Sequence, residues 1–462
     1  MKNTYLDLIE QTFEFPQEGF SVKDNWLSFN DIPLKEIIEE YGTPLRLTYL
    51  PRIRMQIERS RKWFRTSMEK ANYDGKYYYC YCTKSSHFAH VMDAVTSTGC
   101  HLETSSAYDI DIIERLYLNK QINKDTFIIS NGFKTNIYTQ RIAKMINLGF
   151  NMLPVLDNKE ELDNYTETVI GECNLGIRIA AEEQPDFQLY TSRLGIRYSE
   201  IKDFYQDKIK PNKQFKLKML HFFINSGIRD NMYYWNELSK SLKVYCDLKK
   251  VCKELDSLNI GGGFPARNSL GFEYDYEYIV DEIINKIKDT CDQEGVPVPN
   301  IFTEFGSFTV AESGAHIFSV IGEKQQNDSE RWYMIDNSLM TTMPDTWGIN
   351  SRFILMPINN WEGEPQRSNI GGLSCDQMDY YNSEAHTNEL YLPRIPKGGQ
   401  LYIGFFHTGA YQESISGYGG IKHCMIPSPR HILIDKNADG EHKITEFASQ
   451  QKVETMLDIL GY

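Results

Sequence analysis

The chain has 462 residues, of which 41% are hydrophobic and 24% are charged, and its formal net charge is −14. A chain of this length and composition is typical of a globular protein with two or three domains. The acidic net charge argues against a general nucleic-acid or anionic-membrane surface.

The N-terminal segment MKNTYLDLIEQTFEF carries acidic residues and lacks the apolar core of a signal peptide. No apolar run in the sequence reaches membrane-spanning length. The nine cysteines are scattered and odd in number, which argues against a secreted disulfide framework. Cys80 and Cys82 have no second ligand pair nearby, and the ten histidines show no tight metal-ligand spacing. We therefore expect a cytoplasmic protein with no metal site, no nucleic-acid partner and no membrane partner.

From about Gly42 to Gly314, strand-like apolar runs alternate with amphipathic helical stretches. The strand-like runs are LRLTYL, KYYYCYC, CHLETSS, TFIISNG, NMLPVLDN, NLGIRIA, LKMLHFFI, LDSLNIGGG and NIFTEFG. So many βα units in one domain-sized stretch favour a (β/α)8 barrel over an open sheet. Chemistry in such barrels takes place at the C-terminal ends of the strands.

After about Ala315 the pattern changes to short strand-like segments with turns between them. These segments are IFSVIGEK, RWYMIDN, RFILMPI, QLYIGFF and HILID. Little helix is expected there apart from the final VETMLDILGY, so the pattern predicts a β domain.

Lys84 closes the aromatic, strand-forming run YYYCYC in YYYCYCTKSS. A lysine at the end of a buried strand can face a desolvated pocket, where its pKa falls. Its neutral amine then attacks carbonyls, including the aldehyde of pyridoxal phosphate. The alternative interpretation is a solvated residue that caps the strand.

The segment SLNIGGGFPAR places Gly261, Gly262 and Gly263 directly after a predicted strand. Without Cβ atoms in the way, backbone N–H groups can approach and bind a phosphate. A tight βα turn explains the triplet equally well. The spacing matches neither the dinucleotide-binding fingerprint nor the P-loop.

Two glutamates end predicted strands of the barrel. Glu304 can hold a pyridine nitrogen in its protonated state, although a capping or ion-pairing role is the alternative. Glu103 can pair with Lys84, or it can be structural.

Three further candidates lie in the predicted β domain. Cys375 and Asp376 place a thiol beside a carboxylate, which can handle a proton and a substrate ammonium group; a simple turn is the alternative. The hydroxyl of Tyr411 can reach a phosphate, or the side chain can be packed in the fold.

Taken together and in order, several segments resemble the fold-type III pyridoxal-phosphate decarboxylases, and most closely the biosynthetic arginine decarboxylases. These segments are YCTKSSH, LETSSAYD, ISNGFK, LHFFINSG, NIGGGFP, TEFGSFTVAESG, SLMTTMPDTWGI, LSCDQMD and GFFHTGAYQE. The strings MPDTWGI and GFFHTGAYQE resemble the arginine enzymes in particular.

The resemblance implies an α/β fold with an alanine-racemase-like (β/α)8 TIM barrel that binds pyridoxal 5'-phosphate, followed by a C-terminal β-domain. We expect residues 46–314 to form the barrel and 315–462 the β-domain, which residues 1–45 join. The resemblance also implies a homodimer whose active sites are shared between the subunits.

Site roles follow from the same resemblance. Lys84 would carry the cofactor, Glu304 would meet its pyridine nitrogen and Glu103 would neighbour Lys84. The phosphate would be held by Gly261, Gly262, Gly263, Ser226 and Tyr411. From the partner subunit, Cys375 would return a proton to the α-carbon and Asp376 would bind the distal cationic group. Candidates for a further substrate-facing acid are Asp336 and Asp345.

This chain departs from the family pattern in three respects. Phe223 stands where the family usually has a histidine against the cofactor ring; it keeps a stacking face and loses the polar tip. Ser307 replaces a usual arginine, which removes one cation. The chain is also shorter than typical biosynthetic arginine decarboxylases.

The predicted function is decarboxylation of a basic amino acid, L-arginine giving agmatine and CO2, a reaction of polyamine biosynthesis. The same chemistry could act on lysine, ornithine, diaminopimelate or carboxynorspermidine. A non-catalytic homologue that binds partners or regulates is the alternative of a different class.

Overall fold

The computed structural model describes residues 3–181 and 192–462. The chain divides into two compact units. The barrel unit comprises Arg54–Pro265 and Tyr274–Thr309, and the sheet unit comprises Met1–Ile53, Ala266–Glu273 and Val310–Tyr462. Among the described helices, none combines the length and the apolar character that crossing a membrane requires.

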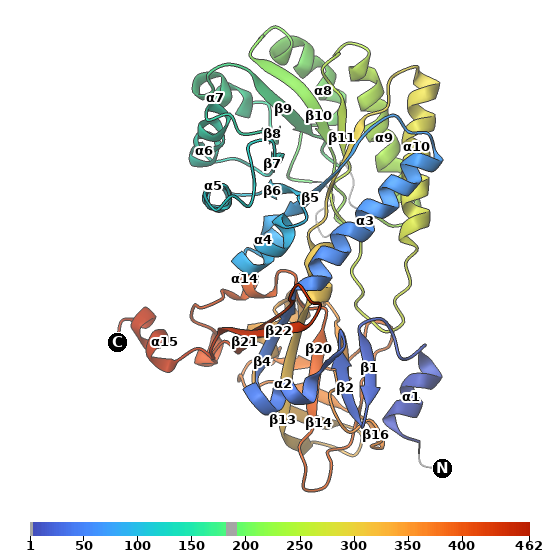
Figure 1. Cartoon of the computed structure of the whole chain (residues 1–462), viewed down its shortest axis with the longest axis vertical. Helices are drawn as coiled ribbons and strands as arrows, with labels where there is room; N and C mark the ends of the chain where they lie inside the picture. Colours follow the sequence, from blue (N-terminus) through green and yellow to red (C-terminus); the bar gives the residue numbers. More distant parts are fainter. Residues whose placement is uncertain (1–2, 182–191) are drawn as a thin grey trace. The chain divides into compact units, whose positions relative to one another are not determined.

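Eight parallel strands of the barrel unit close into a barrel in the order β10-β11-β12-β5-β6-β7-β8-β9 (Figure 1). Their bounds are β5 (Tyr77–Cys82), β6 (His101–Thr104), β7 (Ile128–Ser130), β8 (Met152–Leu156), β9 (Cys173–Arg178), β10 (Phe215–His221), β11 (Ser257–Asn259) and β12 (Asn300–Glu304). One buried apolar cluster draws its side chains from five of these strands, so it fills the barrel interior: Cys80, Ile129, Leu153, Val155, Met219 and Phe302. The predicted (β/α)8 barrel is confirmed.

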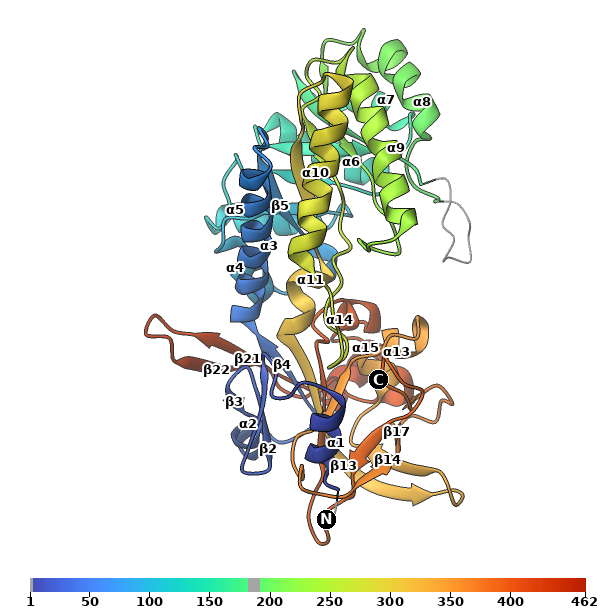
Figure 2. The same cartoon turned by 90° about the vertical axis from the view of Figure 1, so that its right-hand side faces the viewer.

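Helices follow the strands of the barrel unit. They are α4 (Ala89–Thr96), α5 (Asp109–Leu118), α6 (Asn136–Asn147), α7 (Glu161–Thr168), α8 (Tyr198–Phe204), α9 (Met232–Lys249) and α10 (Tyr276–Glu294). Helix α3 (Leu50–Lys70) precedes β5, and the short α11 (Ser307–Val310) follows β12. Side-chain caps start several of them: Asn231 accepts from the amide of Tyr234 at α9, and Asp275 accepts from Tyr278 at α10. Helices α9 and α10 lie side by side (Figure 2).

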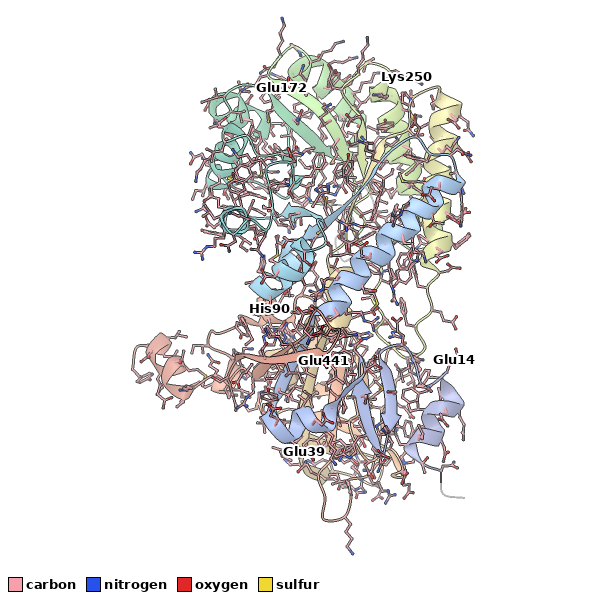
Figure 3. The ribbon with its side chains drawn as sticks, in the orientation of Figure 1. Glu14, Glu39, His90, Glu172, Lys250 and Glu441 are labelled. Carbon is pink, nitrogen blue, oxygen red and sulfur yellow. The ribbon has the colours of Figure 1, made fainter. Side chains whose placement is uncertain are left out.

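Surface ion pairs occupy the end of the barrel at which the strands begin. Lys250, labelled in Figure 3, follows α9 and lies 2.6 Å from Glu294 at the end of α10. Lys216, at the start of β10, lies 3.9 Å from Glu172, which precedes β9. Because both pairs lie at the surface and each has at least one exposed partner, each contributes little to stability. The opposite end of the barrel carries the polar residues described below.

The predicted strand LRLTYL is not part of the barrel. It forms β4 (Leu45–Tyr49) of the sheet unit, where it pairs antiparallel with β13 (Gly314–Gln325) and parallel with β21 (Arg430–Lys436). All five residues of β4 are buried. A strand buried on both faces has a continuous apolar pattern in either kind of sheet, so its pattern alone did not reveal its partners.

A nine-stranded sheet organises the sheet unit. Its main path is β18-β17-β14-β13-β4-β21-β22, and β20 pairs with both β13 and β15. The remaining bounds are β14 (Arg331–Ile335), β15 (Ile354–Pro357), β17 (Asn369–Gly371), β18 (Tyr380–Tyr381), β20 (Tyr402–Phe406) and β22 (His442–Ala448). Two small sheets accompany it: β1 (Phe20–Lys23), β2 (Trp26–Phe29) and β3 (Ile32–Pro33), and β16 (Pro365–Arg367) with β19 (Tyr391–Pro393).

The helices of the sheet unit are short. They are α1 (Tyr5–Thr12), α2 (Leu34–Tyr41), α12 (Leu339–Thr342), α13 (Asp345–Gly348), α14 (Gln412–Ser416) and α15 (Val453–Leu460). The last one agrees with the helix predicted from VETMLDILGY. The buried Trp361 joins the N-terminal segment to this unit, because its ring packs against Tyr5 and Phe15 at 5.3 Å in each case. The barrel unit thus begins at residue 54 and ends at 309, where the sequence predicted 46 and 314.

Candidate active site

Parallel strands in a closed barrel all end at the same rim, and four of the predicted site residues lie there. Lys84 lies in a single 3-10 turn (Thr83–Ser85) directly after β5, and Glu103 lies in β6. Glu304 is the last residue of β12. Gly261 follows β11. Because β11, β12, β5 and β6 are consecutive neighbours in the barrel, these residues occupy one sector of the rim.

Glu304 is the centre of a buried hydrogen-bond network. Asn131 Nδ2 donates to both carboxylate oxygens at 2.9 Å, and Asn259 Nδ2 donates to Oε1 at 2.5 Å. Burial raises the pKa of Glu304 above its ordinary value, and the charge of Lys84 and these amides oppose the rise. The carboxylate is therefore fixed in position by neutral donors and remains able to pair with a cation.

Glu103 is fully buried and lies beside Lys84. Its Oε1 accepts from Ser105 Oγ at 2.8 Å and from Asn131 Nδ2 at 3.2 Å. Its Oε2 lies 3.7 Å from Lys84 Nζ, so the structure brings the two predicted partners together. The side chain of Lys84 is 46% exposed, however, so this chain alone does not provide the desolvated environment that the aromatic strand suggested. The 3-10 turn carries the lysine beyond the buried end of β5, which explains the difference.

The triple glycine forms a turn that side chains could not occupy. Gly261 and Gly263 have φ angles of 71° and 117°, which disfavour other residues. A Cβ on Gly262 would collide with the carbonyl oxygen of Glu304, and one on Gly263 would lie 2.7 Å from the Cα of Gly227. The amide of Gly261 donates to Asn259 Oδ1, whereas among the described residues the amides of Gly262 and Gly263 have no recorded acceptor.

Ser226 comes from the loop after β10 and lies next to this turn. The amide of Ile228 donates to the carbonyl oxygen of Gly263 at 2.9 Å, which holds the two loops together. The Oγ atom of Ser226 is buried and has no hydrogen-bond partner within the described part of the chain. Two amides and a hydroxyl for which residues 3–181 and 192–462 supply no partner, at adjacent strand ends, are suited to bind an anion.

Phe223 and two residues that the sequence did not single out complete the rim. The guanidinium of Arg178, the last residue of β9, lies 5.9 Å from the centroid of the half-buried Phe223 ring. His221 is buried, and its Nε2 lies 3.5 Å from Glu304 Oε2. Burial and the charge of Arg178 hold the pKa of His221 well below its ordinary value, so its ring is neutral at neutral pH.

Neither Arg178 nor Asn259 stood out in the sequence. Each of these residues is the last residue of a strand whose sequence is an ordinary apolar run. Only the strand order of the closed barrel shows that they lie at the rim. Strand-end position is the one signal that could have identified them, and it is shared by many structural residues.

The other predicted site residues belong to the sheet unit. Cys375 is exposed, and Asp376 Oδ1 accepts from the amide of Met378 at 2.8 Å in the same loop. Tyr411, with a φ angle of 66°, immediately precedes α14.

Two aspartates of the sheet unit are already hydrogen-bonded. Asp336 accepts from Thr43 Oγ1 at 2.5 Å and from both the amide and Oγ of Ser319, at 3.1 and 2.8 Å. Asp345 accepts from Gln412 Nε2 at 2.8 Å, so it lies next to the helix that follows Tyr411. Burial raises the pKa of both carboxyl groups. Asp336 thus has a structural role in joining segments of its own unit.

Comparison with known protein families shows to which family the chain with this site belongs. The family described as "Pyridoxal-dependent decarboxylase, pyridoxal binding domain" matches residues 54–311, more than half of the chain. The chain belongs to this family. It is therefore a decarboxylase that uses pyridoxal 5'-phosphate, as the sequence predicted.

Curated relatives and solved structures agree with this assignment. The biosynthetic arginine decarboxylase of Citrifermentans bemidjiense is 22% identical over 87% of this chain and 81% of its own length. The structure of the biosynthetic arginine decarboxylase from Campylobacter jejuni is similar with a TM-score of 0.81, at 21% identity over 99% of this chain and 90% of that one. A diaminopimelate decarboxylase from M. jannaschii in complex with L-lysine has a TM-score of 0.77, at 17% identity over 94% of this chain and 96% of that one.

The residues at the rim fit the cofactor. The cofactor has a phosphate, a ring nitrogen and an aldehyde, and the rim offers donors without partners, a buried carboxylate and an amine for these groups. When bound, pyridoxal phosphate supplies an electron-withdrawing ring that accepts the electron pair released as CO2 leaves an amino acid. Ser307 begins α11 and contributes no cation. The guanidinium of Arg178 interacts electrostatically with Glu304.

Proposed function

We propose that this enzyme converts L-arginine to agmatine and CO2, the first committed loss of carbon in a route to polyamines. The observation that supports the chemistry is Glu304, a buried carboxylate held by two amides next to Lys84 and the glycine turn. The relatives that match 87% of the chain at 22% identity are named biosynthetic arginine decarboxylases, which supports the substrate.

In this proposal the barrel residues bind and orient the cofactor. The amine of Lys84 would hold the cofactor covalently through its aldehyde, with release of water, and Glu103, 3.7 Å from that amine, would orient it. Glu304 keeps a proton on the ring nitrogen, because an ionised carboxylate is the natural partner of a pyridinium. Gly261, Gly262, Gly263 and Ser226 would hold the phosphate, and Phe223 would offer the ring an aromatic face. Tyr411 remains a proposed phosphate ligand.

The sheet unit provides the groups that handle the substrate. Cys375 returns a proton to the α-carbon after CO2 has left, and Asp376 binds the guanidinium at the far end of the substrate. Of the two further acids, Asp345 is the better candidate, because three hydrogen bonds already occupy Asp336. We further propose that the enzyme is a cytoplasmic homodimer in which Cys375 and Asp376 act on the partner subunit's cofactor.

A second candidate keeps the reaction and changes the substrate. Diaminopimelate and lysine decarboxylases are among the similar structures, with TM-scores of 0.77 and 0.66. Lysine, ornithine, diaminopimelate and carboxynorspermidine all carry a cationic amine in place of the guanidinium. An ammonium group makes point contacts, whereas a guanidinium binds a carboxylate with two parallel hydrogen bonds.

The test is a panel of these amino acids with CO2 and the amine product measured for each. We expect the highest kcat/KM for L-arginine and agmatine as the product. A preference for another amino acid would refute the arginine assignment and keep the decarboxylase chemistry.

Lys84→Ala is the control for the chemistry itself. The variant should lose turnover and the yellow, borohydride-sensitive absorbance of the lysine-bound cofactor. Wild-type turnover in this variant would refute the role of Lys84.

A further inference from the structure

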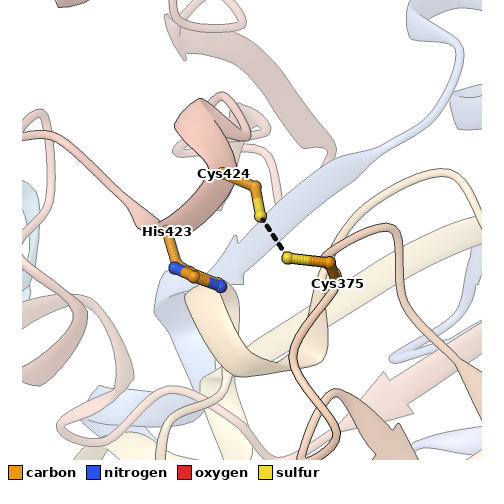
Figure 4. A group of neighbouring side chains, drawn as sticks. All are labelled: Cys375, His423 and Cys424. Atoms are coloured by element: carbon orange, nitrogen blue, oxygen red, sulfur yellow. Dashed lines mark hydrogen bonds between the residues drawn. The ribbon is translucent and has the colours of Figure 1, made fainter.

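Three metal-binding side chains meet on the surface of the sheet unit, and none of the roles above uses them together. Cys375 lies in the loop between β17 and β18, whereas His423 and Cys424 lie in a single 3-10 turn (His423–Met425) that precedes β21. One ligand atom from each residue lies within 4.8 Å of the other two. Figure 4 shows the imidazole and both thiols pointing toward one another from these two segments.

The sequence predicted no metal site because it contains no close ligand spacing. Cys375 and the His423–Cys424 pair are far apart in the sequence, so their proximity is visible only in the folded structure. All three side chains are exposed, and an ion from solvent can therefore reach them.

The separation of the two sulfur atoms is close to the edge of a zinc tetrahedron. The two sulfur atoms are 3.6 Å apart. Zn–S bonds of about 2.3 Å at the tetrahedral angle place two thiolates about 3.8 Å apart, and a thiolate and an imidazole nitrogen about 3.6 Å apart. A disulfide requires the sulfur atoms to approach to about 2.05 Å, which is much shorter than the observed separation.

We propose that Cys375, His423 and Cys424 bind one Zn²⁺ ion, with water as the fourth ligand. Two thiolates and one imidazole favour zinc over magnesium or calcium, which prefer oxygen ligands. On binding, each thiol loses its proton to the buffer and the imidazole coordinates in its neutral form. Three protein ligands and an open fourth position make this an accessible site that exchanges its metal.

Zinc binding would remove the Cys375 thiol from proton transfer. This consequence rests on the proposed function, whereas the site itself does not. A zinc-bound thiolate has no proton to return to the α-carbon. The enzyme would therefore be inhibited reversibly by free zinc.

The binding test uses the full-length chain, stripped of metal with a chelator under reducing conditions. Titration with Zn²⁺ in competition with a chromophoric chelator should show one bound ion per chain. Cys424→Ser and His423→Asn should each weaken zinc binding by about 100-fold or more, because each removes one of three bonds. His386→Asn changes an exposed histidine elsewhere in the same unit and should leave zinc affinity unchanged.

Thiol reactivity gives an independent readout, because the seven other cysteines are buried. A thiol reagent should modify two cysteines quickly in the metal-free protein and neither in the zinc-loaded protein. Failure to bind zinc in stoichiometric amounts would overturn the proposal. The proposal would also be overturned if Cys375 and Cys424 reacted with the reagent only after treatment with a reductant, because the two residues would then be joined as a disulfide.

Turnover separates this proposal from the proposed function. Zinc should inhibit the wild type, and Cys424→Ser should be inhibited only at about 100-fold higher zinc, because it retains Cys375 and lacks the site. Tight zinc binding without inhibition would contradict the role of Cys375 while supporting the metal site.

Discussion

Asn131 provides the sharpest test of the proposed cofactor site. Its Nδ2 group donates to both oxygens of Glu304 at 2.9 Å and to Glu103 at 3.2 Å. The substitution Asn131→Leu keeps the side-chain volume and removes these donors. A hydrogen bond to a charged group is worth about 1.5–3 kcal/mol, and 1.36 kcal/mol corresponds to about a factor of ten in rate. Losing it should raise the pKa of Glu304 further above its ordinary value, beyond the rise that burial already causes.

The variant should therefore lose activity in a pH-dependent way. Because an ionised Glu304 is the proposed partner of the ring nitrogen, kcat/KM should fall most at the acidic end of the pH profile, by up to about 10- to 100-fold. The loss should shrink as the pH rises, because the carboxyl group then ionises again. The assay is the pH profile of kcat/KM for the preferred amino acid, with cofactor occupancy followed by absorbance.

Asn300→Leu is the matched control. Asn300 begins the same strand that Glu304 ends, and its Oδ1 accepts from the amide of Lys76 at 3.0 Å. This substitution should leave the pH profile unchanged. An equal deficit of Asn131→Leu at every pH, or no deficit, would refute the proposed coupling between the amide and the carboxylate.

Three further predictions concern the glycine turn, the dimer and the half-buried His101. Gly262→Ala should weaken cofactor binding by at least about tenfold in a fluorescence titration, because the new Cβ would collide with a backbone carbonyl. Gly348→Ala, with nothing within 4 Å of the new Cβ, should leave it unchanged, and equal effects would contradict the steric argument. Mixing Lys84→Ala with Cys375→Ala subunits should restore roughly a quarter of wild-type activity if sites are shared, and none if each subunit is self-contained. Burial lowers the pKa of His101 from 6.5 to about 4, so its stabilising contribution is present above pH 6.5 and is lost as the pH falls through about 4. In urea unfolding across this pH range, the free energy of unfolding of His101→Asn should vary with pH by up to about 3 kcal/mol less than that of the wild type. An unchanged pH dependence would refute the assignment.

Much of the barrel could be predicted from the sequence because its strands are short apolar runs regularly separated by helices. Eight of the nine runs in that series form the barrel. LRLTYL was the exception, because its pattern does not say which strands lie beside it. Pairing between distant segments, such as Leu47 of β4 with Ile432 of β21, leaves no local signal.

The residues of the candidate site that could be predicted are those whose residue type and position in the sequence alone suggest a role. Lys84, Glu304 and the glycine triplet each follow or end a strand and belong to a residue type with a clear role. Asn259 contacts Glu304 from the adjacent strand β11, whereas Asn131 contacts it from the end of β7, which is not a neighbour of β12, and such contacts depend on the closed barrel. The Cys375–Cys424 approach likewise depends on the fold and not on spacing.

Strand β4 has a consequence for synthesis on the ribosome. It pairs with β21, and roughly 400 residues lie between them, a stretch that takes about 20–80 s to translate. The barrel unit emerges in the meantime and can fold first. During this time the five residues of β4, all buried in the folded protein, lack their partner strand β21. Nascent chains halted before Arg430 should therefore bind chaperones through this early segment.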